Sequence, residues 1–262
     1  MILVYHNVSK KILTKYCVSI ETFYRQMEYL QAYEVVYLHD YHPANLRQIV
    51  LTFDDGYSDV IDYALPILEK WNYPFEIFVI GNYIGKINSY DRGREPEARC
   101  ADIDQLKRAA NSLARIQWHS RNHTHLGSVP KNVLLHELDL PSNLTDLFPE
   151  PHFRWLAYPY GDHTDEVVNI ARSRFDGAVS VFGGNDNDLH QLNRIEVTEE
   201  SKFFLTAHEK DTAMARMENE IQVKNTQIAM MKTILSSRSW RYTAHLRKLG
   251  MLGSKIKKLF AR

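Results

Sequence analysis

Over its first 200 residues the chain alternates short runs of β-branched and apolar residues with longer stretches of helical periodicity. This alternation is typical of repeated βα units, whose strands lie side by side in a mainly parallel sheet. The expected strands are residues 2–5, 35–38, 49–53, 75–80, 115–118, 155–157, 178–182 and 194–197. The expected helices are residues 20–30, 57–71, 103–113, 131–147 and 164–174. The sequence therefore predicts an α/β fold whose ligand site lies at the carboxyl ends of the strands.

The composition is that of a globular protein with a balanced charge. The 262 residues are 44% hydrophobic and 24% charged, which excludes collagen-like, low-complexity and mostly disordered chains. Lys plus Arg and Asp plus Glu both number 32, so no overall field favours a nucleic-acid partner. Cys17 and Cys100 are too few for a disulfide framework, and neither a signal peptide nor a transmembrane run is recognisable. We therefore expect a reduced, cytoplasmic protein.

The composition changes after Phe204. Proline no longer occurs, and apolar residues recur near heptad spacing, with Lys224 on the same seam. The seam residues are Met214, Met217, Ile221, Ile228, Met231 and Leu235. From Ser236 to the end there are eight Lys and Arg residues and no Asp or Glu. We expect a catalytic domain at residues 1–202, a long helix or coiled coil at 203–235, and a basic amphipathic tail at 236–262.

Polar residues directly follow several of the expected strands. His6 follows the first strand, Asp54 and Asp55 follow residues 49–53, and His119 follows residues 115–118, with His123 four positions later. These side chains are expected to meet at one end of a parallel sheet. Taken alone, Asp-Asp-Gly also fits a surface turn. The two histidines, with His125 nearby, also fit a histidine-rich loop.

The histidine spacing nevertheless suits a metal site. Two histidines four residues apart lie on one face of a helical turn, which is an arrangement found in zinc sites. His119, His123 and the Asp55 carboxylate would leave coordination positions open for water or substrate, as a catalytic divalent metal requires.

The same residues carry a family resemblance. Thr52-Phe53-Asp54-Asp55-Gly56-Tyr57, His119-Ser120-Arg121-Asn122-His123 and Ala157-Tyr158-Pro159-Tyr160-Gly161 resemble three motifs of the polysaccharide deacetylases, the NodB-homology carbohydrate esterases of family four. Ile2-Leu3-Val4-Tyr5-His6-Asn7-Val8 is similar to the opening of their permuted branch, which includes poly-N-acetylglucosamine deacetylases. The resemblance implies a distorted (β/α) barrel of about seven parallel strands, to which the composition after Phe204 adds a C-terminal helical, basic extension.

The resemblance also implies a role for each matching residue. Asp55, His119 and His123 would hold one divalent metal, commonly zinc, with cobalt or nickel as alternatives. Asp54 would be the general base and His6 the general acid. Pro159 and Tyr160 would shape the acetyl pocket, and the Tyr160 N–H would help to bind the oxyanion.

The arginine that orients the base in many family members is missing from its usual position. Ala157 stands where many members have an arginine that orients the base. Arg194 resembles the position that supplies an arginine in the permuted branch, and we group it with the substrate-binding residues, although a surface salt bridge is an equal alternative. His208 could mimic a C-terminal histidine of the unpermuted members, but it ranks below His6 as the acid.

The tail adds a second, shorter resemblance. Residues 236–247, SSRSWRYTAHLR, are similar to a segment found beside glycosyltransferase and methyltransferase modules of bacterial surface-glycan synthesis. We expect residues 203–235 to self-associate or to bind a glycosyltransferase, and the tail to contact the inner membrane face peripherally. A solvated basic tail is the alternative.

The expected function is metal-dependent removal of acetyl groups from N-acetylated sugars of a polysaccharide or glycan precursor. Three alternatives remain open at this point. The same site would serve an O-acetyl esterase or a small-amide hydrolase, and a barrel without activity would serve as a scaffold that recruits glycan-synthesis enzymes to the membrane.

Overall fold

The computed structural model describes residues 1–12, 14–201, 221–226 and 228–229. The chain divides into two compact units, Met1–Phe204 and Leu205–Arg262. In the second unit, residues 221–226 and 228–229 are helical, with Ile221 and Ile228 exposed. Most of the expected heptad seam, the basic tail and His208 lie outside the described residues.

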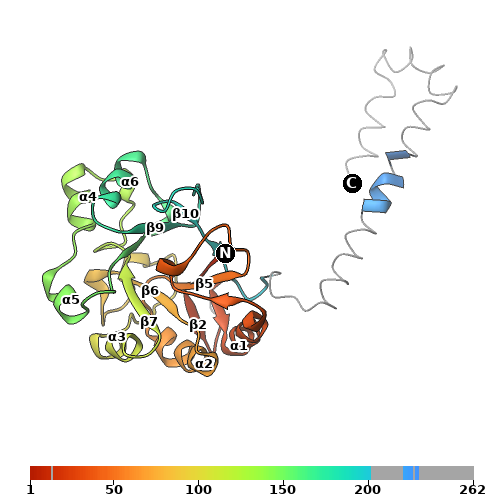
Figure 1. Ribbon diagram of the computed structural model, residues 1–262, viewed down its shortest axis with the longest axis horizontal. Helices are drawn as coiled ribbons and strands as arrows, with labels where there is room; N and C mark the ends of the chain where they lie inside the picture. Colours follow the sequence, from red (N-terminus) through yellow and green to blue (C-terminus); the bar gives the residue numbers. More distant parts are fainter. Residues whose placement is uncertain (13, 202–220, 227, 230–262) are drawn as a thin grey trace, which may run out of the picture. The chain divides into compact units, whose positions relative to one another are not determined.

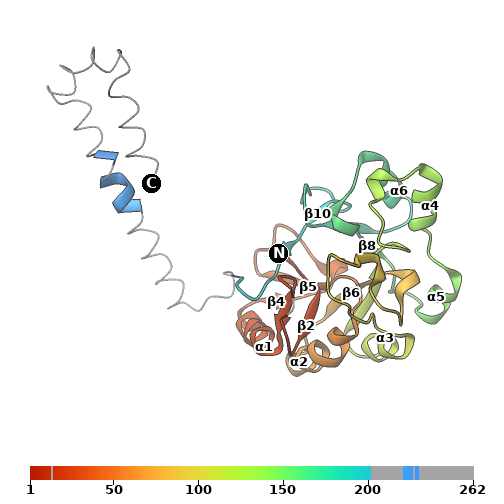
Figure 2. The same ribbon diagram turned by 180° about the vertical axis from the view of Figure 1, so that it is seen from behind.

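The first unit is built on a parallel sheet that nearly closes into a barrel (Figures 1 and 2). The strand order is β10-β9-β8-β7-β6-β5-β1-β11, and β4 pairs with β5 outside this path. The bounds are β1 Ile2–Tyr5, β4 Glu34–Val35, β5 Gln48–Phe53, β6 Phe75–Val79, β7 Ala114–Trp118, β8 Trp155–Ala157, β9 Gly177–Ser180, β10 Leu192–Asn193 and β11 Ile195–Glu196. The expected α/β barrel of parallel strands is confirmed.

The strand expected at residues 194–197 is in fact divided. Leu192–Asn193 pairs with β9, whereas Ile195–Glu196 pairs with β1 at the other end of the strand order. Arg194 lies between the two, and its N–H donates to the Ser180 carbonyl at 2.9 Å. One short stretch of chain therefore joins the two ends of the sheet, with Arg194 at the join.

The helices lie around the sheet, and two of the predicted helices are shorter in the structure than in the prediction. The bounds are α1 Ile20–Tyr29, α2 Leu65–Trp71, α3 Ile103–Ala110, α4 Lys131–Glu137, α5 Ser142–Leu147 and α6 Asp165–Arg172. The helix expected at 131–147 is broken before Pro141, because proline lacks the N–H that would continue α4. The helix expected at 57–71 begins as a π-helical turn at Val60–Ala64 before α2. A small sheet of β2 Asn7–Ser9 and β3 Cys17–Ser19 was not predicted.

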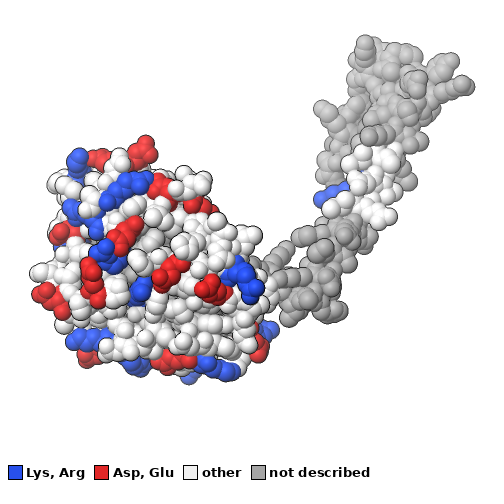
Figure 3. All heavy atoms as spheres, viewed as in Figure 1, with Lys and Arg blue, Asp and Glu red and all other residues white. Residues whose placement is uncertain are grey.

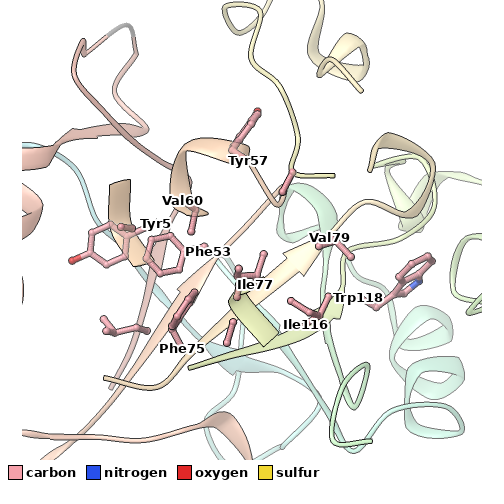
Figure 4. Packing of buried hydrophobic residues seen from close by; sticks show 14 of the residues in the cluster. Tyr5, Phe53, Tyr57, Val60, Phe75, Ile77, Val79, Ile116 and Trp118 are labelled. Carbon is pink, nitrogen blue, oxygen red and sulfur yellow. The ribbon is translucent and has the colours of Figure 1, made fainter. Parts of the chain in front are cut away.

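The strands bury both of their faces. A large cluster lies on one face, where Tyr5 stacks on Phe53 and Phe53 meets the edge of Phe75 (Figure 4). Alternate positions carry a smaller cluster, as expected when successive strand residues point to opposite sides. Its members are Ile2, Leu38, Val50, Phe78, Trp155, Ala157, Val179 and Leu192.

A polar pair from neighbouring strands, Glu76 and Gln117, is also buried. Glu76 of β6 accepts hydrogen bonds from Gln117 Nε2 at 2.8 Å and from the Leu38 N–H at 2.9 Å. Both Glu76 and Gln117 are fully buried. A buried polar pair of this kind is stable only because its hydrogen bonds are made internally.

Charged side chains of both signs are mixed on the face of the first unit that Figure 3 shows, where Lys and Arg are interspersed with Asp and Glu. Within the described part of the chain, we find no helix with the length and apolar character needed to cross a membrane.

Candidate active site

A cavity of about 340 Å³ lies at the carboxyl ends of the strands. His6 follows β1, Asp54 and Asp55 follow β5, and His119 follows β7, with His123 in the next loop. All five line the cavity. The structure therefore brings together the residues that sequence analysis selected from three separate segments.

The Asp-Asp-Gly turn directs both carboxylates into this cavity. Asp54 stays in register, and its N–H donates to the Tyr5 carbonyl at 2.9 Å. Asp55 and Gly56 then adopt left-handed backbone angles, with φ of 67° and 63°. A Cβ on Gly56 would also approach Val79 Cγ1 to 3.0 Å. Aspartate tolerates the left-handed region better than most residues, and glycine adopts it freely, so this sequence suits the turn.

His119 and His123 meet through a loop, and not on the helical turn that their spacing suggested. Ser120 and His123 both have left-handed angles, with φ of 64° and 57°, and such residues do not continue a helix. The His123 N–H donates to Ser120 Oγ at 3.0 Å, and the two imidazole ring centres lie 4.9 Å apart. The predicted pairing holds, but its helical explanation was wrong.

Asp55, His119 and His123 together form a group that could hold a metal ion. Asp55 Oδ1 lies 3.3 Å from His123 Nε2 and 3.6 Å from His119 Nε2. The three ligand atoms all lie within 4.8 Å of one another. His119 Nδ1 donates to the Ala157 carbonyl at 2.8 Å, which leaves the lone pair on Nε2 directed at the group.

The pKa values of these three side chains bear on whether they can bind a metal ion. Burial, and then the Asp54 carboxylate, raise the pKa of Asp55 well above its usual range. Burial lowers the pKa of both histidines, so they are neutral, as metal ligands must be. Asp55 Oδ1 is buried without a hydrogen-bond partner among the described residues. A divalent metal beside this carboxyl would offset the rise in its pKa and keep it ionised.

Asp54 has a different partner. Arg194 Nη1 and Nη2 donate to the two carboxylate oxygens of Asp54, each at 2.6 Å, and Nη1 also donates to Thr52 Oγ1 at 3.2 Å. Burial alone would raise the pKa of Asp54, but the Arg194 charge outweighs it and holds that pKa well below its usual range. Asp54 therefore stays ionised.

Arg194 does not line the cavity. Its buried guanidinium bonds Asp54 and can therefore orient the proposed base. The expected substrate contact and the alternative of a surface salt bridge do not agree with this position. Ala157, which stands where the family has an arginine, contributes only its carbonyl to His119.

His6 lines the same cavity, close enough to Asp54 for the carboxylate to act on its pKa. Its Nδ1 is buried without a hydrogen-bond partner in the described chain, and its ring centre is 5.0 Å from that of Tyr16. Burial lowers the pKa of His6 to about 4, against the opposing charge of Asp54. His6 is therefore neutral at neutral pH in this arrangement and must gain a proton before it can act as an acid.

The third motif forms the remaining wall. Pro159–Gly161 is a tight turn in which Tyr160 has a φ of 58°. The Tyr160 hydroxyl donates to Asp91 Oδ1 at 3.2 Å, and its ring packs 4.4 Å from His123 and 4.1 Å from His125. His125 thus contributes to packing around the site and is absent from the metal-binding group.

Sequence reasoning missed several residues of the cavity wall. Asp91, Arg94 and Glu95, from the segment between β6 and α3, line the cavity. Tyr16, Phe182 and Glu196 line it as well. Their segments come together only through the closure of the barrel, so no local pattern marked them.

Comparison with known proteins places this geometry in a family context. Residues 42–174 match the family described as polysaccharide deacetylase. The chain is 24% identical over 182 residues to the poly-beta-1,6-N-acetyl-D-glucosamine N-deacetylase of Staphylococcus epidermidis, covering 62% of this chain and 60% of that protein. It is 23% identical over 239 residues to the protein of the same name from Staphylococcus aureus strain N315, covering 79% of each.

A solved structure shows the same fold. The Streptococcus pyogenes deacetylase PplD, solved in complex with acetate, superposes with a TM-score of 0.64 at 23% identity, covering 76% of this chain and 92% of that one. The chain spans only about half to three fifths of the length of the first curated relatives it matches.

Proposed function

The chain belongs to the polysaccharide deacetylase family, and we propose that it is a metal-dependent hydrolase that removes acetyl groups from N-acetylated sugars of a glycan. The observation that carries this proposal is the convergence in one cavity of a possible metal group, an ionised Asp54 and an unpartnered His6. The names of the staphylococcal relatives support N-acetylglucosamine as the sugar.

Asp55, His119 and His123 would hold the metal. Their one carboxylate and two imidazoles suit zinc, with cobalt and nickel as alternatives. When bound, a divalent cation would polarise the acetyl carbonyl and lower the pKa of water. His119 is already fixed in the tautomer that such a site needs by its bond to the Ala157 carbonyl.

The other residues would move the proton. Asp54, oriented by Arg194, takes a proton from the attacking water while a C–O bond forms to the acetyl carbon. The Tyr160 N–H would help to bind the carbonyl oxygen as it becomes negative. His6, after taking up a proton, gives it to the sugar nitrogen as the C–N bond breaks and returns to the neutral imidazole, while the proton on Asp54 is released to solvent. The products are acetate and a free amino sugar.

The acid is the reason to favour an amide over an ester. An amine leaves only after protonation, so the His6 imidazole in the cavity wall is needed for N-acetyl hydrolysis and much less for O-acetyl hydrolysis. The inactive-scaffold alternative has little support, because all five residues needed for catalysis meet in one cavity.

We also propose a peripheral contact of the basic tail with the cytoplasmic membrane face. It rests on the sequence of residues 236–262, where cations alternate with Trp240, Leu246, Ile256, Leu259 and Phe260.

Acetate release tests the proposed reaction. Purified chain loaded with zinc should release acetate from β-1,6-linked N-acetylglucosamine oligomers, and more slowly or not at all from O-acetylated oligomers without N-acetyl groups. His119→Ala is the matched control, because it removes one metal ligand and leaves Asp54 and His6 in place. Release from esters alone would favour the esterase alternative, and equal release by His119→Ala would exclude the proposed metal site.

A further inference from the structure

Glu137, the last residue of α4, is a buried carboxylate beside the loop that carries His123. Its side chain is 3% exposed. Its Oε2 accepts the Asn122 N–H at 2.9 Å, and its Oε1 accepts Asn122 Nδ2 at 2.6 Å. Among the described residues, no Lys, Arg or His side chain forms a salt bridge with it. Both of its oxygens are thus bound to Asn122, the residue that precedes His123.

Helix stability does not explain a carboxylate at this position. Glu137 ends α4, where the helix dipole is negative and an acidic side chain is unfavourable. Burial adds a desolvation cost, which only well-made hydrogen bonds offset. The two bonds to Asn122 are the compensation that the structure shows.

The loop between His119 and His123 has a backbone conformation that its surroundings must stabilise. Ser120 and His123 both have left-handed backbone angles, which non-glycine residues keep only when their surroundings impose them. Arg121 donates to the His136 carbonyl at 2.9 Å and to Asp139 at 3.0 Å, so the loop has a second, more exposed tie to the same helix end. The bonds from Glu137 reach the residue next to His123 and are half-buried.

We propose that Glu137 is a positioning residue for the metal centre. By clamping both donors of Asn122, it fixes the left-handed conformation of His123 and so directs His123 Nε2 toward Asp55 Oδ1, 3.3 Å away. This inference rests on the proposed metal site and names a residue outside the family motifs that shapes it.

The test compares zinc affinity with the stability of the metal-free protein. Glu137→Gln keeps the size of the side chain but places an amide NH₂, which is a donor, against one of the two Asn122 donors. One of the two hydrogen bonds is therefore lost. Competition with a chromophoric chelator should show about tenfold weaker zinc binding, in the range typical for lost support of metal ligands. Asp139→Asn is the matched control, because it weakens the exposed tie through Arg121 and should leave zinc affinity unchanged.

Three results would overturn the proposal. The first is a Glu137→Gln protein that binds zinc as tightly as the parent. If its metal-free form also melts at a lower temperature, Glu137 has a purely structural role. The second is an equal loss of affinity in Asp139→Asn. The third is a parent protein that binds no zinc, which would overturn the metal site as well. If Glu137→Gln does not fold, Asn122→Ala removes the side-chain bond to Glu137, together with the exposed bond from Asn82, and keeps the backbone bond. Unchanged zinc affinity in that variant counts against the proposal equally.

Discussion

The guanidinium of Arg194 and the carboxylate of Asp54 form two parallel hydrogen bonds of 2.6 Å, with both side chains buried. Arg194 stands at the break between β10 and β11, where the two ends of the sheet meet. Asp54 directly follows β5, which only β1 separates from β11 in the strand order. Closure of the barrel and orientation of the proposed base therefore depend on the same residue.

Removal of Arg194 should destabilise the fold as well as the reaction. Arg194→Ala leaves Asp54 buried without its cation, and loss of one member of a buried pair typically costs about 3–5 kcal/mol. Urea unfolding of the metal-free protein measures this loss. Arg172→Ala, which breaks the more exposed pair with Asp188, is the control and should cost at most about 1 kcal/mol. Similar values for the two variants would show that the Arg194 pair has no special role.

The His6→Ala variant separates the proposed acid from the rest of the site. It should keep its metal, because His6 is not part of the metal-binding group. Hydrolysis of N-acetyl substrates should fall about 100-fold or more, whereas activated esters, whose leaving groups need no proton, should be much less affected. Steady-state rates on the two substrate types are the measurement. An equal loss on both would remove His6 from the acid role.

Glu76 should make stability fall as the pH rises. Burial raises the pKa of this carboxyl from its usual 4.5 to about 7. Between these values the folded protein keeps the proton that the unfolded chain has lost, so the cost of ionising Glu76 grows with pH and is complete above about pH 7.

The comparison that isolates this effect is the unfolding free energy at pH 5 and pH 8, measured in chelator for the parent and for Glu76→Gln. The parent should lose about 2–3 kcal/mol more than the variant across this interval, since each unit of pKa shift corresponds to about 1.4 kcal/mol. Identical pH profiles would mean that Glu76 titrates normally in the folded state.

The tail prediction concerns residues outside the described part of the chain. Its eight Lys and Arg residues, each worth on the order of 1 kcal/mol near an anionic surface, should bind vesicles that contain phosphatidylserine. Deletion of residues 236–262 should abolish sedimentation with such vesicles and leave hydrolysis of a soluble substrate intact. Binding that survives the deletion, or that does not weaken with added salt, would contradict the proposed electrostatic anchor.

Sequence patterns predicted the strands, and the side chains that meet at their carboxyl ends, because both depend on local signals. Buried parallel strands are continuous apolar runs, and the residues that follow them are placed by the sheet itself, as for His6, Asp54 and His119. The short strands β2 and β3 and the break at Pro141 were missed, since three-residue strands carry little periodicity and the helical pattern continues across the proline.

The contacts that support the site could not be predicted in this way. Arg194 meets Asp54, and Glu137 meets Asn122, only after distant segments pack together. Ser120 and His123 adopt left-handed backbone angles although neither is a glycine. The sequence therefore carried no sign of these angles, and a helical turn was expected there.

Zinc titration of the chelated protein tests the central claim most directly. Acetate release from an N-acetylglucosamine oligomer should be absent without metal, rise with added zinc and level off at one equivalent. Asp54→Asn should bind the same equivalent of zinc yet release acetate about 100-fold to 10,000-fold more slowly. Acetate release that persists in the chelated protein, or an Asp54→Asn variant as active as the parent, would contradict the account.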